Sequence, residues 1–364
     1  SNSIQGLAIV MSGCATALIF DVRYKLGNWA SVLFTCSAGL LGIFTFLGTA
    51  GLGPLIFLRQ ETVIFRIDYW RAGLKMSLAH PFFGVGIDSY GDFYQQYRSF
   101  EATYRTGPER VTNTAHNIFL DIASGSGLVA GLVFLSIFFI LFVKAREVWH
   151  FETIDNSVIT FISLGSGYLV FCLISINQIG IAVWGFLFLG VLHGLKVNHK
   201  ESKKKPFQRQ KKLEPESEYI NRKLFAPQNY RTTIRVSLFA VFGLFLSLPP
   251  LIQDGKMLQA VRHLDFDKMK SIAYSDYSTV FHRNKYTDLL ISQGKLSEAT
   301  NFSIYEIARN DRDFYSLKVV AFSEYAPTSL RLDALKKLES FDPNNSEFLI
   351  ELMKIRESLT SEIS

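Results

Sequence analysis

Charged residues are scarce in this 364-residue chain, at 19% of the total, and there are only three cysteines. A water-soluble domain usually carries about 25% charged residues, so part of this chain avoids water. With so few cysteines, all in apolar stretches (Cys14, Cys36 and Cys172), the sequence predicts neither a disulfide scaffold nor a metal site. The hydrophobic content of 48%, with 32 phenylalanines, is instead typical of a membrane protein.

Six apolar runs are long enough to cross a bilayer, because about 20 helical residues span its hydrocarbon core. They cover residues 4–20, 29–47, 125–143, 158–176, 179–195 and 234–251. The sequence therefore predicts an all-α fold: a polytopic membrane helical bundle of about six spans. Only Asn177 and Gln178 separate the fourth run from the fifth, so these two should form a tight hairpin. We expect the last helix to end at Pro249-Pro250, because proline lacks an amide donor.

The positive charges predict how the chain is oriented in the membrane. Residues 196–235 carry twelve Lys and Arg against four Asp and Glu, which places this linker in the cytoplasm. Binding of anionic lipid by the linker is an alternative interpretation. Counting spans from the linker puts residues 59–124 and 252–364 on the periplasmic or external side. The chain would then enter its first span from outside, without a starting Met, so we expect further spans before it.

This topology predicts six segments. They are membrane helices at 1–58, an external loop at 59–124, membrane helices at 125–195, a cytoplasmic linker at 196–233, a membrane helix at 234–251 and an external helical domain at 252–364.

The external loop is rich in arginine. Six of its seven basic residues are arginines, balanced by seven acidic residues. The planar guanidinium suits paired hydrogen bonds to phosphate or carboxylate, although ordinary surface salt bridges are the alternative. We expect helices at 61–80 and 87–98, with Arg66 and Trp70 on one side of the first, a tight turn at 84–86, and an irregular polar loop at 99–113.

His116 is the candidate proton acceptor of this loop. An imidazole can take a proton from a hydroxyl near neutral pH. In the alternative interpretation, His116 and Asn117 form a polar pair that starts the following helix, with Asn117 as its cap.

Three motifs together resemble the signature region of bacterial O-antigen ligases and polymerases. They are Arg66-x-x-x-Trp70, His80-Pro81-x-x-Gly84-Val85-Gly86, and His116-Asn117 followed by nine residues and Gly127. The resemblance covers roughly residues 30–195. It implies a metal-independent glycosyltransferase of the bacterial inner membrane that needs no cofactor and acts in lipopolysaccharide or other cell-envelope polysaccharide biosynthesis.

The resemblance also implies substrates and residue roles. The donor would be a glycan on a polyprenyl diphosphate such as undecaprenyl diphosphate, and the acceptor lipid A–core or a growing glycan. His116 would activate the acceptor hydroxyl and Arg66 would bind the diphosphate. The further candidates for substrate contact are Arg59, Arg71, Arg98, Arg105, Asn117 and Trp70.

The C-terminal segment, residues 252–364, shows helical spacing and resembles degenerate tetratricopeptide repeats. Such an array would bind a protein partner or hold the glycan. The alternative functions are a protein O-oligosaccharyltransferase of the same family and a non-catalytic membrane anchor that presents a repeat domain. A transporter ranks last, because ionisable residues are nearly absent from the spans. Nothing in the sequence indicates nucleic-acid binding.

Overall fold

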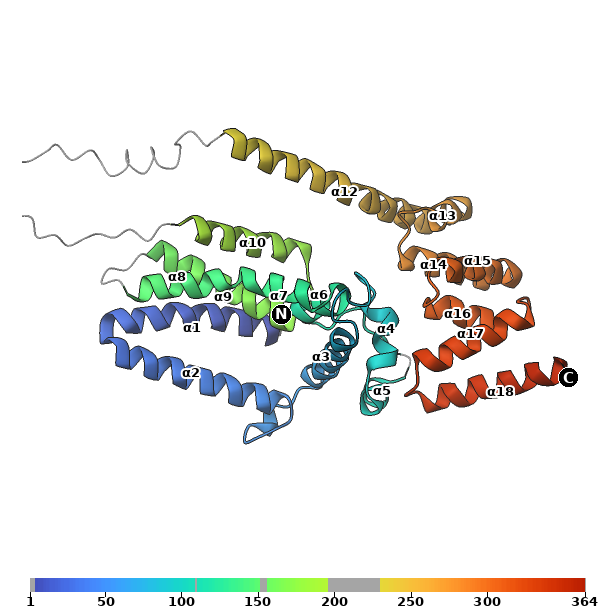
Figure 1. The fold of residues 1–364 in the computed structure, drawn as a ribbon, viewed down its shortest axis with the longest axis horizontal. Coiled ribbons are helices and arrows are strands. Elements are labelled where there is room, and N and C mark those ends of the chain that lie inside the picture. Colours follow the sequence, from blue (N-terminus) through green and yellow to red (C-terminus); the bar gives the residue numbers. More distant parts are fainter. Residues whose placement is uncertain (1–3, 109, 151–155, 196–229, 364) are drawn as a thin grey trace, which may run out of the picture. The chain divides into compact units, whose positions relative to one another are not determined.

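The computed structural model describes residues 4–108, 110–150, 156–195 and 230–363, and every regular element in these ranges is a helix (Figure 1). The predicted all-α class is therefore confirmed. The helices form two compact units, one of Ser1–Glu201 with Lys336–Ser364 and one of Ser202–Leu335. Residues 196–229, which hold most of the predicted basic linker, lie outside the described ranges.

Four helical stretches of the first unit are long and apolar enough to cross a bilayer. They correspond to α1 (Ile4–Leu26), α2 (Asn28–Thr49), α7 with α8 (Leu128–Ile137 and Phe139–Trp149), and α9 (Asn156–Ile174). With 19 to 22 residues each, they reach about 28–33 Å at 1.5 Å per residue. The hydrocarbon core is about 30 Å thick, so the chain is a multi-span membrane protein. The apolar helix α10 (Ile179–Gly194) is shorter.

Small residues let α1 and α9 approach each other closely. A Cβ at Gly13 of α1 would lie 3.2 Å from the carbonyl oxygen of Ser163, and one at Gly167 of α9 would lie 3.3 Å from that of Ile9. Membrane helices associate through such close packing, because lipid supplies little hydrophobic driving force between them. Figure 1 shows α1, α2, α9 and α10 side by side, and this bundle carries the loop.

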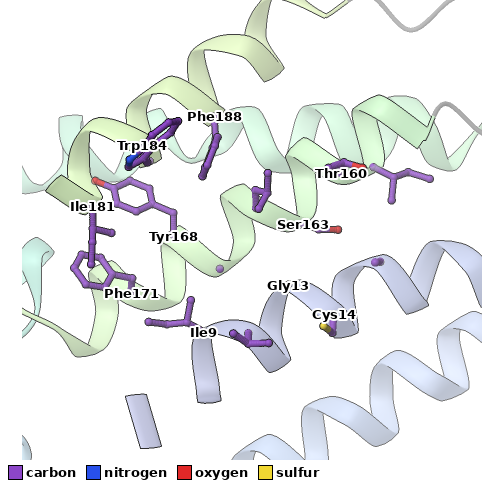
Figure 2. Close-up of a pocket in the computed structure, with 16 residues that line it drawn as sticks. Ile9, Gly13, Cys14, Thr160, Ser163, Tyr168, Phe171, Ile181, Trp184 and Phe188 are labelled. Carbon is purple, nitrogen blue, oxygen red and sulfur yellow. The ribbon is translucent and has the colours of Figure 1, made fainter. Parts of the chain in front are cut away.

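The bundle also encloses an apolar cavity of about 570 Å³ between α1, α9 and α10. Figure 2 shows Ile9 and Cys14 of α1 on one side of it, and Tyr168, Trp184 and Phe188 of α9 and α10 on the other. None of the candidate site residues lines this cavity.

The loop that follows α2 folds into a short 3₁₀ turn, η1 (Ile56–Leu58), and then α3 (Glu61–Ala79), α4 (Tyr90–Tyr97), α5 (Phe100–Thr106) and α6 (Ile118–Ser126). Helix α3 ends before Pro81 as predicted, and α4 lies within the predicted helix at 87–98. The prediction of an irregular segment at 99–113 was wrong in part, because α5 occupies its first half. The Ser99 hydroxyl caps α5 by accepting from the amide of Ala102 at 3.2 Å.

Two predicted helix ends were also wrong. The apolar run at 125–143 is interrupted at Gly127, whose φ of 93° ends α6 before α7 begins. Helix α12 (Tyr230–His263) runs through Pro249-Pro250 instead of ending there. Each proline removes only one backbone hydrogen bond, and in an apolar environment an ended helix would expose more unpaired backbone groups than a continued one.

The second unit contains short amphipathic helices after α12. They are α13 (Phe266–Ala273), α14 (Val280–Ser292), α15 (Leu296–Arg309), α16 (Phe314–Phe322) and most of α17 (Thr328–Phe341). Asp265, Thr279 and Asp313 cap three of them. Consecutive helices pack as neighbours, but the likeness to tetratricopeptide repeats stays a prediction. The last helix, α18 (Ser346–Ile363), belongs to the first unit.

Candidate active site

His116 lies in a tight turn just before α6. Its backbone has a φ of 54°, in the left-handed region that side chains other than glycine rarely adopt. The His116 amide donates to the hydroxyl of Thr114 at 3.1 Å, and the Ala115 amide donates to the carboxylate of Asp121 at 2.6 Å. These bonds fix the turn on both sides of the strained residue. Such strain, where neighbours hold it in place, is typical of functional sites.

Asn117 begins α6. Its side-chain oxygen accepts from the amide of Leu120 at 3.1 Å, and the residue is buried. The capping role that the sequence left open is therefore present. The oxygen of Asn117 is therefore engaged in the helix cap, and contact of Asn117 with substrate stays a prediction.

The first turns of α3 bring Arg66 and Tyr69 to His116. The ring of Tyr69 stacks on the imidazole, with centroids 5.6 Å apart and planes at 27°. Burial and then the positive charge of Arg66 lower the pKa of His116 below its ordinary value. In this arrangement the neutral imidazole can act as a base, and the guanidinium beside it can bind an anion.

The Arg66 guanidinium is partly buried, which lowers its pKa, yet an arginine stays charged at any physiological pH. The carboxamide oxygen of Gln5, at the start of α1, accepts from it. This contact holds the guanidinium between the membrane bundle and the loop.

Trp70 packs against the membrane bundle. Its indole stacks on Phe46 of α2, with centroids 6.3 Å apart and planes at 8°. The indole nitrogen is buried without a hydrogen-bond partner in the described part of the chain. Trp70 therefore joins the loop to the bundle.

The remaining predicted arginines are paired with acidic residues. Arg105 binds Asp68 at 2.6 Å and Arg71 approaches the same carboxylate at 4.0 Å, while the exposed Arg59 binds Glu61 at 3.1 Å. Arg98 differs, because its side chain is buried against Asp342. A guanidinium enclosed in this way offers no face to a phosphate.

Three other residues near the site carried no specific sequence signal. The charge of Arg110 acts on the phenol of Tyr69, although its position had marked it only as one of six loop arginines. The Asp121 carboxyl holds the His116 turn, and burial raises its pKa to about 6. Asp342 lies 244 residues from the arginine that it pairs with. In the described ranges, no three His, Cys, Asp or Glu residues could together hold a metal.

Backbone hydrogen bonds join two of the sequence motifs. The amides of Val85 and Gly86 donate to the carbonyls of Ser124 and Gly125, at 2.7 and 3.0 Å. The amide of Leu128 donates back to the Pro81 carbonyl at 2.8 Å. The His80–Gly86 turn therefore packs along the end of α6, which explains why glycines recur at fixed positions in both motifs.

Both motifs lie in the part of the chain that matches a known family. Residues 1–135 match the model of the family described as O-antigen ligase. Residues 1–135 are therefore similar to the O-antigen ligase family, and we call them the ligase-family region. The match starts before the region expected from the motifs, which was 30–195, and it ends earlier. All predicted site residues lie within residues 1–135. No curated protein and no solved structure matches the chain.

Proposed function

We propose that this protein is an inner-membrane glycosyltransferase that moves a glycan from a polyprenyl diphosphate to a hydroxyl acceptor in surface polysaccharide assembly. The observation that carries the proposal is the strained His116, stacked on Tyr69 beside the charge of Arg66. The similarity of residues 1–135 to the O-antigen ligase family supports the same class of reaction.

In the proposed reaction, His116 takes the proton of the acceptor hydroxyl as its oxygen bonds to the anomeric carbon of the glycan. The bond from that carbon to the diphosphate breaks, and the electron pair leaves with the diphosphate. Negative charge on the leaving group grows toward the transition state, so a fixed guanidinium at Arg66 stabilises the transition state more than the ground state. Attack opposite to the leaving group inverts the anomeric configuration. The reaction uses no metal and no cofactor.

Substrate contact by Arg59, Arg71 and Arg105 is part of the proposal. The Arg59–Glu61 pair is exposed on both sides and weak enough to exchange for a phosphate. Arg71 and Arg105 share the buried carboxylate of Asp68, so they would contact a phosphate with the parts of their side chains that stay exposed. We add Arg110 because of its position near Tyr69. The loop and the C-terminal segment would face the periplasm, where the lipid-linked donor, the lipid A–core or glycan acceptor and any protein partner meet.

The test replaces His116 with Ala in the full-length protein and follows surface polysaccharide by electrophoresis. Loss of a general base should lower transfer by about 10²–10⁴-fold. The exposed His150, just after α8, serves as the control when changed to Ala and should leave the polysaccharide unchanged. A normal polysaccharide together with normally glycosylated proteins in His116→Ala would falsify the proposal and favour a non-catalytic membrane anchor.

The same gel separates the possible acceptors. A ligase that loses activity leaves lipid A–core without any glycan ladder, whereas a polymerase leaves single repeat units attached. If the polysaccharide pattern is unchanged but glycosylated proteins disappear, the acceptor is a protein hydroxyl.

A further inference from the structure

A buried ion pair joins the external loop to the C-terminal segment. The Arg98 Nη2 atom lies 2.8 and 2.7 Å from the two carboxylate oxygens of Asp342, and neither side chain is exposed. Removing one member of such a pair leaves an uncompensated buried charge, so both partners must be present for the loop to keep this conformation.

Neighbouring residues extend the contact on both sides. The Asn344 amide donates to the Arg98 carbonyl at 2.8 Å, and the hydroxyls of Tyr104 and Ser346 lie 2.6 Å apart. We call residues 342–346 the C-terminal clamp. It contacts the end of α4 and the middle of α5, so it holds these helices from outside the ligase-family region.

Arg98 also binds the backbone of the segment that precedes His116. Its guanidinium donates to the carbonyls of Pro108 and Arg110, at 3.0 and 3.2 Å. The carbonyl of Arg110 is six residues before His116 in the chain. The backbone entering the strained turn is therefore fixed by a side chain that Asp342 holds.

A second route runs through aromatic rings. The Arg98 guanidinium lies over the ring of Tyr94 at 6.0 Å, and Tyr94 packs edge-on against Tyr69 at 5.6 Å. Tyr69 stacks in turn on His116. Both routes start at Asp342. The first ends at the backbone six residues before His116, and the second ends at the imidazole.

We propose that Asp342 is a positioning residue for the transfer reaction: by fixing Arg98, it sets the place and the burial of His116. This inference rests on the proposed function for its kinetic consequence. The clamp is thus a working part of the active site, contributed by the C-terminal end of the protein.

The test compares Asp342→Asn with Glu347→Gln in the full chain. Glu347 is an exposed acid on α18, five residues from Asp342, so its variant removes the same charge without touching the pair. For Asp342→Asn we expect kcat to fall by at least about tenfold with little change in KM, because a misplaced base slows the chemical step more than binding. Glu347→Gln should match the wild type.

A second measurement does not depend on transfer activity. The pH dependence of His116 modification by diethylpyrocarbonate, read on its own peptide by mass spectrometry, reports the protonation of that side chain. When Asp342→Asn loosens the turn, His116 becomes more hydrated, and its modification profile should shift toward higher pH. A clamp that only stabilises the fold would reduce the amount of folded protein and leave this profile unchanged.

Asn344→Ala keeps the ion pair and removes one hydrogen bond of the clamp. If Asp342→Asn does not fold, this variant tests whether the clamp positions His116. It should shift the His116 profile in the same direction by a smaller amount. A folded Asp342→Asn variant, or a folded Asn344→Ala variant in its place, with wild-type kcat and profile overturns the inference while the proposed function stands. If the wild-type protein transfers no glycan but the variants still shift the His116 modification profile, the clamp is supported and the proposed function is rejected.

Discussion

The imidazole of His116 depends on its surroundings in two ways. Its left-handed backbone costs about 1–3 kcal/mol, which the bonds to Thr114 and from Ala115 to Asp121 must offset. Local pattern offered the Asn117 cap as an alternative interpretation, and the structure contains it. The catalytic role of His116 came mainly from the family resemblance and stays a prediction. The sequence could not predict the left-handed backbone, which no local pattern specifies, or the stacking with Tyr69, which joins residues about 50 positions apart.

The charge of Arg66 should set the acid limit of activity. Because burial and Arg66 keep the pKa of His116 below its ordinary value of 6.5, the neutral base persists to a pH below 6.5. Replacing Arg66 with Gln removes the positive charge, raises the pKa of His116 and should move the acid limb of kcat/KM to higher pH. Arg66→Lys keeps the positive charge, so the acid limb of its kcat/KM profile should stay at the same pH.

Arg66→Lys should still transfer at least about tenfold more slowly, because the ammonium cannot reproduce the guanidinium fork. Rate profiles from pH 5 to 8 for both variants provide the test. An acid limb that stays in place in Arg66→Gln would mean that the arginine charge does not act on His116.

Asp121 should cost stability at neutral pH. Burial raises its pKa in the folded protein to about 6, above the ordinary 3.8. A carboxyl of this kind favours folding below about pH 3.8, and that contribution is lost as the pH rises through 6. Asp121→Asn keeps an oxygen for the Ala115 amide, so we expect a higher Tm than the wild type at pH 7.5 and an equal Tm near pH 4.

Thermal unfolding in detergent at both pH values checks this expectation. Glu347→Gln, which removes an exposed acid, is the control and should not change Tm at either pH. A lower Tm for Asp121→Asn at pH 7.5 would show that the charged carboxylate itself holds the His116 turn.

At the scale of elements, hydropathy and helical spacing predicted much of the framework. Four of the six apolar runs coincide with spanning helices, and α3 follows its predicted range closely. The errors have local causes. Polarity at 99–113 concealed the Ser99 cap of α5, and the prolines of α12 suggested an end that the apolar surroundings do not require. The pairing of the two glycine motifs needed the structure.

Gly84 is the tightest point of that pairing. It has a φ of 67°, and a Cβ there would overlap the backbone of Ser124 and Gly125. Gly84→Ala should therefore combine backbone strain with a clash that only a shift of the His80–Gly86 turn relieves. We expect the free energy of unfolding to fall by more than the roughly 1 kcal/mol that the backbone strain alone costs. Glycan transfer should fall as well.

Gly294 is the matched control, because its φ is 71° and nothing lies within 4 Å of its Cβ position. Gly294→Ala should show the strain without the clash and leave transfer unchanged. Chemical unfolding of both variants measures the difference. Equal losses would mean that the turn moves freely against α6.

At the scale of the whole molecule, the C-terminal clamp could not be predicted from one sequence. Arg98 and Asp342 are 244 residues apart, and a charge at either position fits a surface role equally well. The positive-inside rule predicted only that both residues lie on the same, external side of the membrane. Their pairing now links the ligase-family region to the end of the chain.

That pairing predicts equal accessibility of the two regions in cells. In a protein freed of its native cysteines, Glu101→Cys and Glu347→Cys introduce thiols at exposed positions near the clamp. A membrane-impermeant maleimide should label both in intact spheroplasts. Ser202→Cys, in the basic linker, should react only after permeabilisation. Labelling of Glu101→Cys and Glu347→Cys from opposite sides would exclude the Arg98–Asp342 pair in the membrane.

The ion pair also restricts how the chain threads the bilayer, by simple parity. Two residues can touch on one side only if the chain between them crosses an even number of times. Between Arg98 and Asp342, two crossings are already supplied by Leu128–Trp149 and Asn156–Ile174. Where the linker at 196–229 stays on one side, as the sequence predicts, the short α10 and the long α12 either both cross the membrane or both do not. With 16 residues, α10 covers only about 24 Å, so its crossing would require the bilayer to thin around it.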